Sequence, residues 1–401
     1  MAHNFDEIID RGKNSLTYSA KWQGFSANYE GYSIDEATAL PMWVADMDLR
    51  APQEVVDAIV KRAAHGIYGY VAQDANRRLF DAAAGWFLRR YGWKADPADM
   101  FFSPGIVPVI NMTVQAFTDP ADGVIVMQPV YYPFANAVNE NGRTLVNVPL
   151  LCDDGYYTID YASLEEACKQ EKNRLLIFSS PHNPVGRVWK KEELTQVFDI
   201  CARHGVLVFC DEIHADLIMP GHAHTAAGTL DAHLDCMILA HAPSKTFNLA
   251  GLSVSIITVP NTDLRRRLKA HMEACCLPSG NVGNIFGPVA GIAAYTHGDA
   301  YVDELCAYLD GNIRHIADFL KERLPQVSLR APEGTYLIWP DFAGTGLSAE
   351  EIYRKAFEEA GVIGDPGKWF GKGGDTFIRY NVACPRARVE EMCRRLYDAF
   401  A

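Results

Sequence analysis

The feature that most constrains the fold is a repeated alternation, in the middle of the chain, of short apolar runs and longer amphipathic stretches. The apolar runs lie at 124–127, 175–179, 206–210, 237–240 and 255–259. Runs this short and this apolar are typical of strands that are buried on both faces of a sheet. The stretch at 190–203, between two of these runs, has the apolar spacing of an amphipathic helix. Strands that alternate with helices predict right-handed crossovers and a largely parallel α/β sheet.

The pattern changes after about residue 285. Two helical stretches, at 286–295 and 301–323, lead to a final helix that begins near Val389. Short strand candidates lie between them, at 327–330, 335–339 and 376–382. Because strands and helices no longer alternate regularly, this part of the chain is predicted to form an α+β unit.

We therefore expect two domains, a large one over 49–285 and a small one formed by 1–48 together with 286–401. A chain of 401 residues is long enough for two domains that share an interface. Near the start of the large domain, Pro52 is predicted to open a helix. The apolar stripe of that helix consists of Val55, Val56, Ile59 and Val60.

Composition and charge exclude several classes of partner. Lys and Arg number 37 against 50 Asp and Glu, so the formal net charge at pH 7 is −13. This balance argues against nucleic acid and against an anionic membrane surface, since both require a basic face. No apolar run approaches the roughly 18 residues of a membrane span, and the acidic N-terminus does not resemble a secretory signal. Ten cysteines, some within apolar runs, are expected to be reduced thiols. We expect a cytoplasmic protein whose partner is a small molecule.

Polar side chains follow three successive strand candidates. Asn183 follows the run at 175–179, Asp211 follows the next, and Lys245 follows the third. Taken singly, each has an ordinary alternative: a tight turn, a helix cap and a solvated lysine, respectively. Ligands of open α/β sheets bind beyond the carboxyl ends of the strands, where these residues lie. There a desolvated lysine amine becomes a nucleophile and a base, and a carboxylate can pair with a cationic ring nitrogen.

The order Asn183, Asp211, Lys245 resembles the cofactor site of the fold-type I pyridoxal-phosphate enzymes, the class I/II aminotransferase superfamily. The resemblance covers nearly the whole chain. It implies a large domain with a mostly parallel sheet flanked by helices, together with a smaller α+β domain. It also implies that the cofactor is pyridoxal 5′-phosphate, attached covalently to Lys245, with Asp211 keeping the pyridine nitrogen protonated.

Other motifs extend the resemblance around the cofactor. In S-P-G-I-V-P, the amides of Ile106 and Val107 stand where the family binds the phosphate at a helix start. Ser244 is expected to contact the same phosphate. Tyr131 stands where the family stacks an aromatic ring on the pyridine. His214 occupies the position at which many relatives carry a tyrosine that bonds the phenolic oxygen of the cofactor.

The resemblance also assigns residues to the substrate and to a second subunit. Arg379 stands where the family grips the α-carboxylate of its substrate, which the forked guanidinium suits. Ala45 is expected at the substrate as well. Tyr70 resembles the tyrosine that the family lends across a homodimer interface to the phosphate. Ser253 replaces an arginine with which many relatives bind that phosphate.

Two motifs narrow the assignment to one branch. M-W-V-A-D-M-D-L and D-E-I-H-A-D-L resemble the cystathionine β-lyases of the MalY/PatB type, which are carbon–sulfur lyases. This branch implies α,β-elimination from cystathionine or another S-substituted cysteine, giving a thiol, pyruvate and ammonia. In that reaction Lys245 acts as the catalytic base.

Two other functions stay open at this point. The first is a class I/II aminotransferase that acts on a neutral or aromatic amino acid and uses the same residues. The second is a binding protein that has kept the fold without catalysis, against which the presence of Lys245, Asp211 and Arg379 argues. No metal site is predicted, because His222 and His224 lack the supporting ligands of one.

Overall fold

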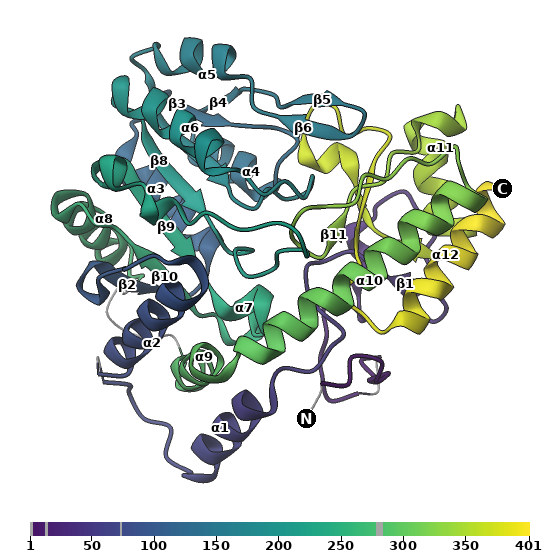
Figure 1. The fold of residues 1–401 in the computed structure, drawn as a ribbon, viewed down its shortest axis with the longest axis horizontal. Coiled ribbons are helices and arrows are strands. Elements are labelled where there is room, and N and C mark those ends of the chain that lie inside the picture. The colour runs from purple at the N-terminus through teal and green to yellow at the C-terminus, as the bar shows by residue number, and fades with distance from the viewer. Residues whose placement is uncertain (1–2, 13–14, 73, 278–283) are drawn as a thin grey trace.

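The computed structural model describes residues 3–12, 15–72, 74–277 and 284–401. Its central element is a seven-stranded sheet with the strand order β2-β10-β9-β8-β7-β3-β4 (Figure 1). The strands are β2 (Met100–Ser103), β3 (Gly123–Val126), β4 (Thr144–Asn147), β7 (Asn173–Ser179), β8 (Leu207–Asp211), β9 (Met237–His241) and β10 (Ser255–Thr258). Neighbours from β9 to β4 are parallel, whereas β10 is antiparallel to both β9 and β2. The prediction of a largely parallel sheet is confirmed, and all five apolar runs form strands with small shifts at their ends.

Both faces of this sheet are buried, which explains why the runs are apolar at most successive positions. In β7, Leu176 and Phe178 pack into one core, and Leu175 and Ile177 pack into the other. Side chains alternate across a strand, so a sheet covered on both sides needs apolar residues at successive positions. Side chains of α3, α4 and α8 belong to the core of Leu175, and those of α5 and α6 belong to the other core. These helices are α3 (Ile106–Phe117), α4 (Pro133–Glu140), α5 (Tyr161–Cys168), α6 (Lys191–Arg203) and α8 (Thr262–Ala274).

Four further helices lie beside the β2 edge of the sheet and between the sheet and the C-terminal elements (Figure 1). They are α1 (Gln53–Ala64), α2 (Asp74–Tyr91), α9 (Phe286–His297) and α10 (Asp299–Arg323). The helix predicted at Pro52 is present and starts one residue later. Val55 of its stripe is buried, but Val56 and Val60 are exposed. The packing of α1 against α9 therefore covers part of the stripe and leaves the rest open.

The C-terminal part contains a second, three-stranded antiparallel sheet in the order β11-β14-β13. Its elements are β11 (Leu337–Ile338), α11 (Ala349–Arg354), β13 (Asp365–Pro366), β14 (Ile378–Asn381) and α12 (Arg386–Phe400). The N-terminal segment joins this part, because β1 (Leu40–Pro41) pairs in parallel with β12 (Val362–Ile363). A hairpin of β5 (Leu151–Asp153) and β6 (Tyr156–Thr158) lies apart from both sheets. The strand predicted at 327–330 is wrong: Ser328 forms an isolated bridge there, and Val327 alone of that run is buried.

All ten cysteines are free thiols. Most are buried, as Cys210 is within β8, and they act as small packing residues. Within the described ranges, no helix is both long and apolar enough to cross a membrane.

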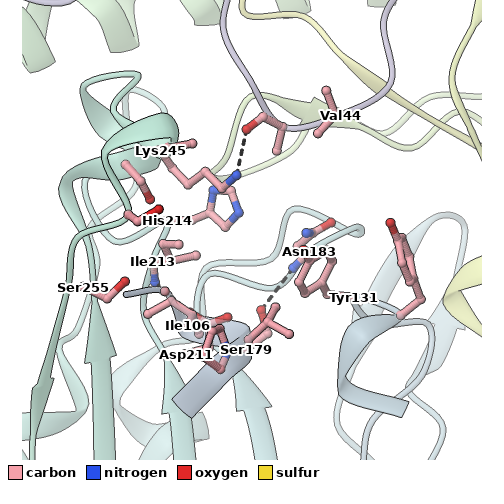
Figure 2. A pocket seen from close by; sticks show the side chains of 18 of the residues that line it. Val44, Ile106, Tyr131, Ser179, Asn183, Asp211, Ile213, His214, Lys245 and Ser255 are labelled. Atoms are coloured by element: carbon pink, nitrogen blue, oxygen red, sulfur yellow. Dashed lines mark hydrogen bonds between the residues drawn. The ribbon is translucent and has the colours of Figure 1, made fainter. Parts of the chain in front are cut away.

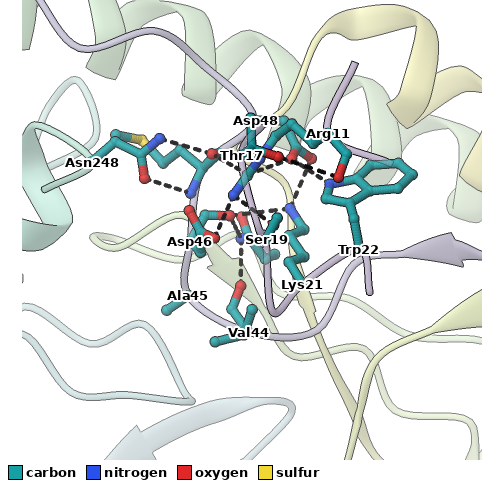
Figure 3. A network of polar contacts seen from close by, with 12 residues as sticks. Arg11, Thr17, Ser19, Lys21, Trp22, Val44, Ala45, Asp46, Asp48 and Asn248 are labelled. Atoms are coloured by element: carbon teal, nitrogen blue, oxygen red, sulfur yellow. Dashed lines mark hydrogen bonds and ion pairs between the residues drawn. The ribbon is translucent and has the colours of Figure 1, made fainter. Parts of the chain in front are cut away.

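A network of buried charges fastens the N-terminal segment to the loop that follows β1 (Figure 3). Lys21 Nζ donates to the Asp48 carboxylate at 2.8 Å and to the Asp46 carbonyl at 3.1 Å. Arg11 binds the carboxylates of Asp46 and Asp48 at 2.6 and 2.7 Å. The Lys21 side chain is 0% exposed. Burial alone would raise the pKa of Asp48, but the neighbouring cations hold it below its usual value. The loop is therefore held in place by ion pairs that water does not screen.

We expect Lys21→Met to destabilise the protein by about 3 kcal/mol, because the variant leaves the buried Asp48 carboxylate with one cation fewer. Urea denaturation at pH 7 measures this. The difference should shrink as the pH falls, since a protonated Asp48 no longer needs the lysine. Arg50→Met, which breaks the exposed pair with Glu7, is the control and should change stability little. Equal effects of the two substitutions would contradict the role assigned to the buried pair.

Candidate active site

Three parallel strands, β7, β8 and β9, end at one edge of the large sheet. Ser179 at the end of β7 lies opposite Asp211 of β8, which in turn lies opposite Ala240 of β9. The loops that follow bring Asn183 and Lys245 to the same edge, around a cavity of about 230 Å³ (Figure 2). The structure thus brings together the three polar residues that the sequence places after successive strands.

The cavity gathers ten of the eleven residues that the sequence analysis assigned to cofactor or substrate. They are Ala45, Ile106, Val107, Tyr131, Asn183, Asp211, His214, Ser244, Lys245 and Arg379. Tyr70 is the exception, because its side chain is fully exposed on the surface of the chain. The individual roles of these residues stay predictions, whereas their common location is a feature of the structure.

Lys245 lies on the short helix α7 (Pro243–Thr246), directly after β9. Its Nζ donates to the Ala45 carbonyl at 2.7 Å, and the Tyr336 hydroxyl donates to the same oxygen at 3.1 Å. Burial and, next, the nearby Arg379 charge lower the pKa of Lys245 to about 8. A far larger fraction of this amine is therefore neutral at physiological pH than of a lysine in water, and the neutral form is the one that acts as a nucleophile or a general base.

The segment 44–48, which we call the strap, carries the Ala45 carbonyl across the cavity. Its backbone is bonded by side chains from distant parts of the chain (Figure 3). Asn381 of β14 donates to two strap carbonyls at 2.7 and 2.9 Å. Asn248, three residues after Lys245, accepts from the Met47 amide at 3.2 Å and donates to the Met47 carbonyl at 2.8 Å. The acceptor of the lysine amine is thus fixed from both sides of the cavity.

Asp211 and His214 are buried polar groups at the floor of the site. Burial raises the pKa of Asp211 to about 7, although the Ile213 amide at 3.1 Å and the Lys245 charge act against it. The His214 Nδ1 has no hydrogen-bond partner within the described part of the chain. Burial, followed by the charges of Lys245 and Arg379, lowers the pKa of His214 well below its usual value, so the ring is neutral. Both groups therefore suit a polar ligand that brings a cation to Asp211 and a polar atom to His214.

Arg379 lies on β14 and reaches the cavity from the C-terminal sheet. One of its terminal nitrogens donates to Asn183 Oδ1 at 2.9 Å, and the other pairs with the Asp365 carboxylate. The guanidinium also lies over the Phe370 ring, 4.9 Å from its centroid. A buried guanidinium held on two sides in this way presents a preorganised fork to a carboxylate.

The start of α3 forms another wall of the cavity. Gly105 caps the helix without a side-chain hydrogen bond, so the first amides, including those of Ile106 and Val107, are not taken up by a cap. A helix N-terminus with open amides suits a phosphate. Ser244 and Ser253 add hydroxyl groups to the lining. Among the described residues that line the cavity, Lys245 and Arg379 are the two cations, so amides and hydroxyls are what this chain offers to a phosphate.

Comparison with known proteins identifies the family. The sequence pattern of the family described as "Aminotransferase class I and II" matches residues 43–396 of this chain. The chain belongs to this family. It is 41% identical over 401 residues to cystathionine beta-lyase PatB of Bacillus subtilis, covering 99% of this chain and all of that protein.

Solved structures of this family place the chain among pyridoxal-phosphate enzymes of fold type I. Cystalysin from Treponema denticola, whose structure contains pyridoxal 5′-phosphate, is 35% identical with a TM-score of 0.92, and the match covers 100% of this chain and 99% of that one. A pyridoxal-phosphate-bound C–S lyase from Staphylococcus hominis is 31% identical with the same TM-score and the same coverage. The fold expected from the sequence is therefore confirmed.

The site also contains residues that the sequence analysis did not single out. Tyr336 shares the Ala45 carbonyl with Lys245, Asn248 holds the strap, and Asp365 pairs with Arg379. Asp365 stands in the run G-D-P-G, which has the composition of an ordinary turn. Asn248 follows Lys245 closely in S-K-T-F-N, and its position beside the lysine was a usable signal. Tyr336 and Asp365 reach the site through pairing between distant segments, which gives no local signal.

We expect the cofactor-free protein to capture pyridoxal 5′-phosphate covalently at a rate that rises with pH and levels off above about pH 8. Only the neutral Lys245 amine attacks an aldehyde, and its pKa is lowered to about 8. Stopped-flow absorbance across a pH series measures the rate. Borohydride reduction followed by peptide mass spectrometry should locate the label on Lys245, and Lys245→Ala should take up none. A rate that still climbs near pH 10, or a label on another lysine, would refute the assignment.

Proposed function

We propose that the protein is a pyridoxal-phosphate-dependent carbon–sulfur β-lyase. It cleaves cystathionine or another S-substituted cysteine, with one water, to a thiol, pyruvate and ammonia. The observation that carries this function is the 41% identity, over the whole chain, to a cystathionine beta-lyase. The gathering of a buried lysine, carboxylate and arginine around one cavity supports it, as does the TM-score of 0.92 with a C–S lyase.

The lining of the cavity fits the cofactor. When bound, pyridoxal 5′-phosphate supplies the electron sink that stabilises negative charge at the α-carbon of an amino acid. In our proposal Asp211, a buried carboxylate with a raised pKa, holds a proton at the ring nitrogen. The amides of Ile106 and Val107, with Ser244, bind the phosphate.

Tyr131 and His214 complete the cofactor site. Tyr131 would hold the pyridine with its ring, and the Nδ1 of His214, which has no hydrogen-bond partner among the described residues, would bind the phenolic oxygen. Because the pKa of His214 is lowered well below its usual value, the imidazole stays neutral beside the cationic groups of the site. The family's tyrosine is thus replaced by a group that cannot ionise to an anion at working pH.

The remaining residues act on the substrate. Arg379, oriented by Asn183, binds the α-carboxylate. The Lys245 amine removes the α-proton as general base, and the Ala45 carbonyl, which accepts its hydrogen bond at 2.7 Å, sets the direction of its lone pair. Loss of the α-proton and departure of the β-sulfur as a thiolate leave an enamine that water converts to pyruvate and ammonia.

We expect the wild-type protein to release pyruvate continuously from cystathionine with no keto acid added. An elimination regenerates the starting form of the enzyme in each cycle, whereas an aminotransferase stops after one equivalent until a keto acid is supplied. Lactate dehydrogenase coupling measures pyruvate, and a thiol reagent measures the co-product. If cystathionine gives neither pyruvate nor thiol, and added 2-oxoglutarate is converted to glutamate in the presence of a neutral or aromatic amino acid, the class I/II aminotransferase takes the place of the lyase.

We also propose that the chain acts as a homodimer in which Tyr70 of one subunit reaches the phosphate bound by the other. Tyr70 and its neighbours Ile67 and Tyr68 are exposed, and so are Val56 and Val60 of α1. Exposed apolar side chains gathered along one helix and the loop after it are typical of a surface that another subunit covers. The described residues that line the cavity include no basic residue dedicated to the phosphate, which would gain a hydroxyl from such a partner.

We expect Val60→Asp to shift the protein from dimer to monomer on dilution, because it places a charge within the proposed apolar interface. Analytical ultracentrifugation measures this, with Leu16→Asp, at another exposed apolar residue, as the control that leaves the dimer unchanged. Tyr70→Phe should keep the dimer and weaken cofactor retention by about tenfold, through the loss of one charge-assisted hydrogen bond. A wild-type protein that sediments as a monomer would refute the proposal.

We also propose a division into two domains and a cytoplasmic location. The large sheet lies within 49–285, and the pairing of β1 with β12 supports a small domain built from 1–48 and 286–401. Ten free thiols support a reducing compartment such as the cytoplasm.

A further inference from the structure

We propose that Asp365 makes the site selective for S-substituted cysteines whose sulfur substituent carries no net negative charge, a class that includes cystathionine, because its substituent brings an ammonium group together with its carboxylate. The proposal rests on the C–S lyase function given above and names the class of leaving group that the site accepts. It depends on the position of Asp365, on the other charged residues that line the cavity, and on the residues that would surround a carboxylate on the sulfur substituent.

The pairing of Asp365 with Arg379 is built into the C-terminal sheet. The two residues lie directly opposite each other on the antiparallel strands β13 and β14, and their side chains form an ion pair that is 2% and 3% exposed. Cross-strand neighbours have their Cβ atoms about 5 Å apart, so this contact is set by the register of the strands. Arg379 therefore already holds one carboxylate before any substrate arrives.

The charged residues around the cavity leave no unpaired cation, among the described lining residues, for a second substrate carboxylate. Among the described residues that line it, four carry a formal charge: Asp211, Lys245, Asp365 and Arg379. Lys245 and Asp211 are assigned to the cofactor, and the charges of Asp365 and Arg379 cancel. The α-carboxylate of any amino acid must then share the guanidinium with Asp365. A further anion on the sulfur substituent that does not bring its own cation has no unpaired cation in this lining, and an unpaired charge in a buried site is strongly disfavoured.

The surroundings of Asp365 strengthen the effect. Burial raises the pKa of Asp365 even though Arg379 acts against it, so the site stabilises a carboxylate poorly. Tyrosines lie near Asp365: burial first, and then charges that include Asp365, raise the pKa of Tyr29, Tyr131 and Tyr132. Uncharged phenols of this kind bring no positive charge that could pair with an anionic substituent. Rejection of an anion beside a resident carboxylate is a repulsive element of specificity.

Two compounds of the same shape test the proposal. S-carbamoylmethyl-L-cysteine and S-carboxymethyl-L-cysteine differ by an amide in place of a carboxylate. In the wild-type holoenzyme, kcat/KM for pyruvate release should be at least about tenfold higher for the amide. Dissociation constants from cofactor absorbance titrations should show the same preference. S-(2-aminoethyl)-L-cysteine, which carries a cation, should be accepted at least as well as neutral S-propyl-L-cysteine.

The variant Asp365→Asn removes the charge and keeps the shape. It should lower the amide-to-carboxylate ratio by about fivefold or more, and comparing the ratio between enzymes cancels the different leaving abilities of the two thiols. Glu333→Gln is the matched control, because Glu333 is the carboxylate partner of another buried arginine, Arg187, away from the cavity. The ratio in that variant should equal the wild-type ratio.

The outcomes separate the proposal from its alternatives. An equal ratio in Asp365→Asn and wild type means that Asp365 merely supports Arg379, and it overturns the proposal. A wild-type ratio near one overturns it without any variant, so the test survives a failure of Asp365→Asn to fold. If none of the compounds yields pyruvate, the lyase function fails, and the absorbance titrations still decide whether the site discriminates by charge.

Discussion

Ser179, Asp211 and Ala240 form one row across three parallel strands, and the rest of the site depends on this register. Because the row lies at the carboxyl ends of the strands, the loops that carry Asn183 and Lys245 leave the sheet at the same edge. A shift of one residue in β8 would turn Asp211 away from the cavity and into one of the two apolar cores. The buried apolar faces of the sheet exclude such a shift. Burial of apolar side chains therefore both stabilises the large sheet and fixes the position of the Asp211 carboxylate.

Burial shifts the pKa values of the ionisable side chains that the strand register brings together. Burial lowers the pKa of Lys245 to about 8 and raises the pKa of Asp211 to about 7, so the two groups approach each other in basicity. In water the same side chains would differ by more than six pH units. Both groups therefore change protonation state near neutral pH, which suits acid-base chemistry there. Arg379 differs from these two groups, because the neighbouring Asp365 carboxylate neutralises its charge.

Much of the fold and part of the site could be predicted from the sequence, because their signals are local. Mostly apolar runs predict five of the seven strands of the large sheet, and polar residues after three of them mark Asn183, Asp211 and Lys245. Asp365 and Tyr336 could not be predicted in this way, since β13 and β11 are two residues long and the residues meet the site only through pairing with β14. The apolar stripe of α1 predicts a helix face that is buried in the core, but two of its four residues, Val56 and Val60, are exposed.

The strap touches the reactive lysine through its main chain, at the Ala45 carbonyl, and its other carbonyls are held by Asn381, Asn248, Arg11 and Lys21. A backbone oxygen is present whatever side chain the residue carries. The strap can therefore exchange the side chains that face the cavity over evolutionary time without losing the atom that orients the base. In the proposed function, the side chains of Val44 and Ala45 line the cavity while the Ala45 main chain orients the base, so a lineage can change the lining and inherit the orienting atom intact.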